Sequence, residues 1–300
     1  MTIINYASDG LYPELIVLFR VVAHLGVVDR KEIINLCYPG TQDDAVGLTR
    51  LRGALARWTE LGLFQIEAES LRLNERFGKQ KRGESIEELT IRLPSACRTL
   101  MLEAPNCLPL WGTPSGTTAD FVRAAAWLLA QDIYNLPTSW SDIEGIQNAQ
   151  TSADQKIIEN DVRWNGLRFW MRYLGFATGD SSAFRVDPTL AVKMELPAIF
   201  ESRTDLSAQE FIMALASSLP VLDFGQYRSA VQEVMNPTVW RPPENGHLSM
   251  SLSLALRRLD LDNVIRLEGR ADTGTSYRLT GRNHRTWLGF ESVRWVGVQL

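Results

Sequence analysis

Cysteine and histidine are both scarce in this sequence of 300 residues. It holds three of each, at Cys37, Cys97, Cys107, His24, His247 and His284. None of these residues forms a CxxC, HxH or HExxH pattern. Structural zinc sites and disulfide frameworks need paired or clustered ligands. The sequence therefore predicts neither a metal site nor a disulfide framework, and scattered cysteines are typical of a reducing cytoplasm.

Motifs that carry catalysis or bind nucleotides are also missing. The chain has no GxGxxG or GxxxxGK[ST] to cradle a phosphate and no GxSxG nucleophile elbow. The GTPSG at 112–116 resembles a phosphate loop in composition alone. Carboxylate pairs such as Asp43-Asp44 are explained by the favourable charge at helix N-termini. We therefore expect a non-enzymatic protein with no catalytic residue and no cofactor.

Long hydrophobic runs and an excess of positive charge are absent too. The longest apolar stretch, 15–28, is interrupted by Arg20 and His24, whereas a spanning helix needs about 20 apolar residues. The N-terminus lacks the basic and apolar regions of a signal peptide. The net charge is −4 and the pI is about 5.6, so any nucleic-acid contact requires a local basic face. We expect a cytoplasmic protein without membrane contact.

The chain does contain a pattern that occurs three times. In the first copy a helix starting at Thr41 or Asp43 carries an apolar stripe of helical spacing, at Val46, Leu51, Leu55, Trp58 and Leu61. Gly62 ends this helix, because glycine readily adopts the left-handed backbone of a C′ residue. Two short strands, 63–66 and 71–73, then flank a polar turn. Helix, stop and two-stranded ribbon form the second half of a winged helix.

The second and third copies repeat this order. Gly175 follows the helix in the second copy, and Asn263 follows it in the third, where asparagine is the next-best left-handed residue. The second ribbon is predicted at 176–178 and 183–188. The third ribbon is predicted as strands 264–267 and 276–279, paired across a turn at 269–274. Each copy is preceded by room for two further helices, and such a repeat outweighs a single match.

The predicted fold is therefore mainly α with short β-hairpins, an α+β class built from three tandem winged-helix modules. The first module covers residues 1–82, and a helical linker covers 83–118. The second module covers 119–206, and the third covers 207–300 together with a C-terminal tail in which 292–298 could form one more strand. Ser85 with Glu88 and Ser207 with Glu210 have the spacing of helix capping boxes.

Basic residues near the predicted third helices and ribbons are candidates for contact with double-stranded DNA. Arg50 and Arg57 are seven residues apart, on the side expected to face away from the apolar stripe, with Arg52 nearby. The remaining candidates are Arg72 in the ribbon, Lys79, Lys81 and Arg82 in the basic run after it, and Arg257 and Arg258 on the third copy's helix. Guanidinium groups suit phosphates and the guanine edge. The alternatives are that these arginines merely solvate a helix surface and that the basic run is a linker.

Protein binding is a second hypothesis. Trp240, Trp287 and Trp295 fall in loops or the tail, and tryptophan is enriched where proteins bind one another. An adaptor that binds partners through its winged helices, or a transcriptional regulator, would fit the same pattern. An arginine-lined face on the third helices favours DNA, whereas an apolar face rimmed with charge favours protein.

The opening helix LYPELIVLFRVVAHLG and the repeated helix–ribbon ends carry a family resemblance. The layout resembles tandem winged-helix proteins of bacteria and archaea, and it is similar to the DpdG-type accessory proteins encoded in deazapurine DNA-modification and restriction clusters. The resemblance covers nearly the whole chain and transfers no functional residue. It implies a non-enzymatic component of a DNA-targeting defence assembly that contains helicases and nucleases, and hence protein partners.

Overall fold

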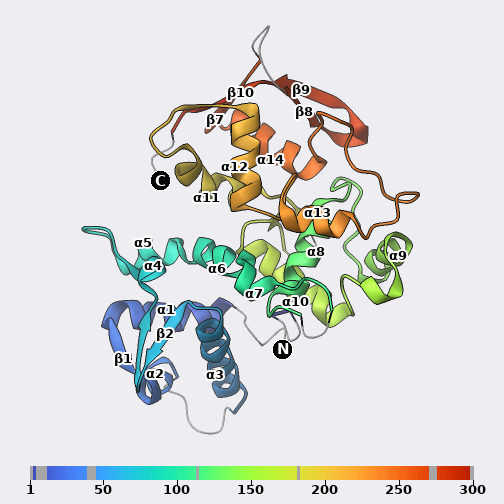
Figure 1. Cartoon of the computed structure of the whole chain (residues 1–300). Coiled ribbons are helices and arrows are strands. Elements are labelled where there is room, and N and C mark those ends of the chain that lie inside the picture. Colours follow the sequence, from blue (N-terminus) through green and yellow to red (C-terminus); the bar gives the residue numbers. More distant parts are fainter. Residues whose placement is uncertain are drawn as a thin grey trace. The chain divides into compact units, whose positions relative to one another are not determined.

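The computed structural model describes residues 3–4, 12–38, 45–112, 115–180, 183–269 and 276–297. Helices dominate these ranges and the strands form small antiparallel sheets, which confirms the predicted α+β class. The chain groups into two compact units (Figure 1). Unit 1 comprises Met1–Ala119 with Val162–Leu174, and unit 2 comprises Asp120–Asp161 with Gly175–Leu300. None of the helices in the described ranges combines the length and apolar character that a membrane crossing requires.

The helices of the first 119 residues are α1 (Tyr12–Leu25), α2 (Arg30–Cys37), α3 (Ala45–Glu60), α4 (Glu75–Gly78), α5 (Ile86–Ile91), α6 (Leu93–Leu102) and α7 (Ala104–Cys107). The later helices are α8 (Ala119–Leu129), α9 (Trp140–Gln150), α10 (Asp161–Tyr173), α11 (Thr189–Phe200), α12 (Ala208–Ser218), α13 (Gln226–Gln232) and α14 (Met250–Leu261). The strands are β1 (Val27–Asp29), β2 (Phe64–Glu67), β3 (Ser70–Leu73), β4 (Ala177–Thr178), β5 (Arg185–Val186), β6 (Asp205–Ser207), β7 (Ile265–Glu268), β8 (Tyr277–Thr280), β9 (Thr286–Phe290) and β10 (Ser292–Trp295).

The first half of unit 1 has the order α1, β1, α2, α3, β2, β3. Strand β3 lies between β1 and β2 in an antiparallel sheet, and α1 packs against α2, α3 and β3. The start predicted for α3, at Thr41 or Asp43, lies outside the described residues. Gly62 ends α3 with a φ of +94°, as the sequence predicts.

The core of unit 1 centres on Trp58, which is fully buried as predicted. Its ring lies 5.6 Å from that of Trp170 on α10, measured between centroids. Leu51, Leu55 and Leu61 of the predicted stripe are buried as well. Val46 is 62% exposed, so its assignment to the stripe is wrong. It lies in the first turn of α3, and the buried residues of the stripe begin at Leu51.

Unit 2 contains a second sheet with an equivalent arrangement. Its order is β6-β10-β7, with β10 antiparallel to both neighbours. Here α11 precedes β6, α12 follows it, and α14 precedes β7. Two insertions distinguish this copy, because α13 lies between α12 and α14, and the antiparallel hairpin β8–β9 lies between β7 and β10.

The third predicted ribbon is therefore wrong in its pairing. Strands do form near 264–267 and 276–279, but β7 pairs with β10 and β8 pairs with β9. Local sequence identifies a strand from its residues, whereas the choice of partner depends on β10, which is distant in the chain. Residues 270–275 of the predicted turn lie outside the described part of the chain. The expected additional strand in the C-terminal tail is present as β10.

Two backbone hydrogen bonds identify equivalent positions where the second helix of each copy begins. In unit 1 the Arg30 N–H donates to the Glu69 carbonyl at 2.8 Å, immediately before β3. In unit 2 the Ala208 N–H donates to the Glu291 carbonyl at 2.7 Å, immediately before β10. The helix start is thus fixed to the central strand in the same way in both copies.

The ends of the third helices correspond in the same manner. The Leu63 N–H donates to the Trp58 carbonyl at 2.8 Å, and the Val264 N–H donates to the Leu259 carbonyl at 2.9 Å. These bonds close the last helical turn around a left-handed residue. Position 58 of α3 therefore corresponds to position 259 of α14, and the two helices can be compared residue by residue.

The second copy has the same kind of helix end, but its elements are divided between the two units. Gly175, with a φ of +81°, follows α10, and β4 and β5 pair antiparallel as predicted. Helix α10 groups with unit 1 from Val162 onward, whereas α8, α9, β4 and β5 belong to unit 2. The predicted division into three modules and a linker stays a prediction, with the ranges 1–82, 83–118, 119–206 and 207–300.

Candidate nucleic-acid interface

Helix α3 presents an exposed face bordered by two arginines. Arg50 and Arg52 are both exposed, and neither guanidinium forms an ion pair with a residue that the structure describes. By helical geometry they border the exposed face on opposite sides. The middle of this face carries Thr49, Gly53 and Ala56, which are small. The face therefore combines two unpaired cations with little steric bulk between them.

Arg57 does not belong to this face. Its side chain is only 9% exposed, and its guanidinium pairs with the Glu60 carboxylate at 2.9 Å. The expectation that Arg57 faces outward is therefore wrong. On the helix surface its neighbours three and four residues away are Ala54 and Leu61, and both are buried. An arginine stem can pack along such an apolar border.

Arg72 of β3 pairs with one acid of its own ribbon and with one acid of α4. The Glu67 carboxylate lies 2.6 Å from its guanidinium, and the Glu75 carboxylate lies 3.7 Å away. These two carboxylates offset the positive charge of the Arg72 guanidinium. A phosphate at this position would compete with two carboxylates.

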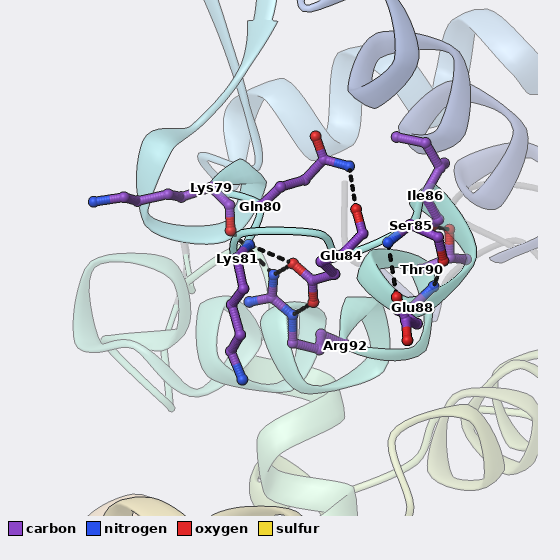
Figure 2. A network of polar contacts seen from close by, with 9 residues as sticks. All are labelled: Lys79, Gln80, Lys81, Glu84, Ser85, Ile86, Glu88, Thr90 and Arg92. Atoms are coloured by element: carbon purple, nitrogen blue, oxygen red, sulfur yellow. Dashed lines mark hydrogen bonds and ion pairs between the residues drawn. The ribbon is translucent and has the colours of Figure 1, made fainter.

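The basic run after the ribbon is a structured segment, residues 79–84, which we call the strap (Figure 2). The Glu84 carboxylate accepts the Lys81 backbone N–H at 2.8 Å and two bonds from the Arg92 guanidinium, at 2.9 and 2.7 Å. Arg92 also donates to the Lys79 carbonyl at 3.0 Å. The Lys81 N–H and the Arg92 guanidinium lower the pKa of the Glu84 carboxyl below its usual value. The strap backbone is therefore held by the Glu84 carboxylate and the Arg92 guanidinium.

The lysines of the strap are left for solvent. The ammonium ends of Lys79 and Lys81 point away from the Glu84–Arg92 pair (Figure 2), and Arg82 is exposed. Across the described ranges, none of these three cations has an ion-pair partner. The predicted capping box of Ser85 and Glu88 is confirmed, and it starts α5 directly after the strap.

The strap and the exposed face of α3 are two separate groups. Within unit 1 the segment between α4 and α5 projects away from α3 (Figure 1). The expectation of a single dense basic region is therefore met by two patches, Arg50 with Arg52 and the strap lysines with Arg82. A duplex that touches both would have to extend along unit 1.

Helix α14 of unit 2 offers less. Arg257 pairs with Asp260 at 3.1 Å, and Arg258 pairs with the buried carboxylate of Asp187. The positions equivalent to Arg50 and Arg52 are Ser251 and Ser253, and both are fully buried. The Ser251 hydroxyl donates to the Leu129 carbonyl at 2.7 Å. This helix therefore turns its corresponding face inward.

Sequence reasoning identified the cations but missed the groups that organise them. Glu84 and Arg92 hold the strap although they lie eight residues apart with a turn between them, and no local pattern links them. Within the described ranges, no group of three or more His, Cys, Asp or Glu side chains is placed to hold a metal ion.

Comparison with known proteins gives one positive finding. The model of the family described as DpdG-like matches residues 1–273 of the chain. The match includes α3, the strap and α14, and it ends before β8. Searches of curated proteins and of solved structures found no match.

Proposed function

The chain belongs to the DpdG-like family, and we propose that it is a non-enzymatic, DNA-binding accessory subunit of a bacterial system that modifies or restricts DNA. The resemblance to accessory proteins of deazapurine DNA-modification clusters supports this setting. The missing catalytic and phosphate-loop motifs in the sequence support a role in binding. Double-stranded DNA and the other subunits of the assembly are the proposed partners.

The topology of unit 1 carries the proposal. The order α1, β1, α2, α3, β2, β3, with β3 central in the sheet, is the order of a winged helix. In DNA-binding proteins with a helix-turn-helix core, the last helix of the three enters the major groove. In this chain that helix is α3. We therefore propose that the exposed face of α3 is the DNA contact.

The composition of that face fits a groove. The major groove is about 12 Å wide and admits one helix, and small residues at Thr49, Gly53 and Ala56 allow a close approach. Arg50 and Arg52 would then reach the phosphates on either side of the groove, or the guanine edge. The strap supplies further cations for a second backbone contact.

A fluorescence-anisotropy titration of a labelled duplex at several salt concentrations tests this proposal. For duplex DNA each lost phosphate contact lowers the log–log salt slope by about 0.9. Replacing Arg50 and Arg52 by Ala should therefore reduce the slope by about 1.8 and weaken binding to all sequences.

The matched control removes the same charge elsewhere. Arg185→Ala with Arg266→Ala takes two exposed, unpaired arginines from strands of unit 2, and it should leave the slope almost unchanged. If wild type binds no duplex at low salt, or if the control variant loses as much as the α3 variant, the proposed contact is wrong.

A specific surface favours an adaptor role as the second candidate. A hollow of about 540 Å³ on unit 1 is lined by residues that include Val21, Leu25, Leu36 and Ile86. The ion pair between Arg20 and Glu87, at 2.6 Å, borders it. An apolar floor with a charged rim is typical of a protein interface. If wild type binds no duplex, this face replaces α3 as the proposed functional surface. The alternative of a transcriptional regulator, which also requires DNA binding, would then be wrong as well.

A further inference from the structure

Unit 2 contains a pocket that the proposed duplex contact does not use. Its volume is about 670 Å³, within the range of small-molecule sites. Its lining comes from residues 130–132 after α8, Gln150 of α9, the loop 238–244, residues 247–250 at the start of α14, and the hairpin β8–β9. The loop belongs to the stretch 236–246, which is long for a connection between two helices.

Two polar groups in this pocket have no hydrogen-bond partner among the residues that the structure describes. The hydroxyl of Thr280 on β8 accepts and donates no hydrogen bond, although the side chain is only 8% exposed. The Nδ1 atom of His247 is also buried without a partner, while its Nε2 lies 3.3 Å from the Thr286 hydroxyl. Buried polar groups are nearly always hydrogen-bonded. A ligand in the pocket would supply the missing partners.

An aromatic wall stands beside these groups. The indole N–H of Trp240 donates to the Ala130 carbonyl at 3.1 Å, which fixes the ring at the edge of the pocket. Pro242 and Pro243 continue this wall. A fixed aromatic ring next to polar groups suits a planar heterocycle, because nucleobases stack on such rings.

One arginine lines the pocket, and three more lie on the hairpin beside it. Arg241 lines the pocket and is exposed, and the hairpin that supplies Thr280 also carries Arg278, Arg282 and Arg285. In the described part of unit 2 these four guanidinium groups have no ion pair. The N-terminal end of α14 also lines the pocket, and its Ser249 N–H donates to the Asp223 carboxylate at 2.6 Å. The lining holds two acids: Asp132, which accepts the Tyr134 N–H and the Asn135 amide, and Glu244, which is exposed.

We propose that this pocket binds one nucleotide unit, with the base against Trp240 and hydrogen-bonded to Thr280 and His247, and the phosphate at Arg241. The unit can be a free nucleoside monophosphate or one unpaired nucleotide in a DNA strand, since both present the same base and phosphate. The proposal does not rest on duplex binding by α3, because every residue in it belongs to unit 2.

Isothermal titration of the full chain with the four deoxynucleoside 5′-monophosphates tests the proposal. Wild type should bind at least one of them with a dissociation constant below about 1 mM. Thr280→Val removes the unpartnered hydroxyl at nearly constant shape and should weaken binding about tenfold. Because that hydroxyl has no partner in the protein, the melting temperature should stay the same or rise.

Arg241→Ala should weaken binding by a similar factor, and Arg266→Ala, an exposed arginine outside the pocket, should not. A duplex with one unpaired nucleotide, compared with the fully paired duplex, distinguishes the DNA source from the free source. Weaker binding of the unpaired-nucleotide duplex by Thr280→Val assigns the site to DNA, whereas an effect on monophosphates alone assigns it to a free nucleotide. No binding of any nucleotide, equal binding of inorganic phosphate, or an equal loss in Arg266→Ala would each overturn the proposal.

Discussion

Helices α3 and α14 occupy the same place in two copies of one arrangement, yet they present opposite surfaces. Both end at a left-handed residue, and both precede a strand that joins a three-stranded antiparallel sheet. In α3 the positions of Arg50 and Arg52 are exposed, whereas in α14 the same positions are Ser251 and Ser253 and are buried. Equivalent backbone therefore does not imply equivalent function.

The surroundings of α14 explain the difference. The end of α8 covers the inner face of α14, where Leu129 accepts the Ser251 hydroxyl. The hairpin β8–β9 forms a separate two-stranded sheet and lines a pocket beside the helix start. Small hydroxyl side chains fit such a contact, and long arginines do not. We infer that the first copy keeps a face for a duplex, while the later copy has gained a site for a smaller ligand.

The largest expected effect concerns the cores of the two copies. Trp58→Ala should lower the free energy of unfolding of unit 1 by about 3–5 kcal/mol, and Leu259→Ala, at the equivalent position, should lower that of unit 2 by about 2–5 kcal/mol. Both side chains are at most 1% exposed. Urea unfolding followed by circular dichroism measures both. An unchanged transition for Trp58→Ala would show that the core of unit 1 is placed wrongly.

The left-handed residue at the end of α3 should tolerate asparagine better than alanine. Gly62 and Asn263 have φ values of +94° and +60°, where residues with a Cβ atom are strained. Gly62→Ala should cost about 1–2 kcal/mol, and Gly62→Asn should cost less because asparagine adopts this backbone more readily. The same unfolding assay compares the two. Equal stability of Gly62→Ala and wild type would contradict the equivalence of these positions.

The smallest effect is a pH dependence at the start of α12. The predicted capping box of Ser207 and Glu210 is confirmed. The Ser207 hydroxyl and N–H, with Arg203, lower the pKa of Glu210 from 4.5 to about 2. A lowered carboxyl pKa stabilises the fold above the unfolded value, and this contribution is lost as the pH falls from about 4.5 toward 2.

Glu210→Gln keeps a capping hydrogen bond but removes the titrating charge. The urea midpoint of the variant should therefore fall less than that of wild type between about pH 5 and pH 3. Because α2 is capped by Asp29 instead, Glu32→Gln is the matched control and should not change the slope. Parallel pH profiles for wild type and Glu210→Gln would refute this assignment.

The sequence predicted features that depend on neighbouring residues. The apolar stripe through Trp58, the stop at Gly62 and both capping boxes follow from spacing over a few residues, and all are present. The third ribbon failed because β7 pairs with β10, which is distant in the chain, and β8 pairs instead with the strand that follows it, β9. Arg57 failed although seven residues bring it within about 20° of Arg50 around the helix, because its buried neighbours Ala54 and Leu61 decided its burial.

The candidate site could likewise be predicted only in part from the sequence. The predicted residues include the cations without an ion-pair partner in the described part of the chain, namely Arg50, Arg52, Lys79, Lys81 and Arg82. Which cations are neutralised depends on folded geometry. Arg258 meets Asp187, 71 residues away in the chain. The pocket could not be predicted at all, because its lining comes from the residues after α8, a loop, the start of α14 and a hairpin. No periodicity connects residues so far apart.

The most direct measurement is to titrate two ligands against two variants. A fully paired duplex and a deoxynucleoside monophosphate are each titrated into Arg50→Ala/Arg52→Ala and into Thr280→Val. We expect the α3 variant to lose about 1.8 in the duplex salt slope and to keep its nucleotide affinity. We expect Thr280→Val to keep the duplex slope and to lose about tenfold in nucleotide affinity. Equal effects of both variants on both ligands would contradict the division of roles between the two copies.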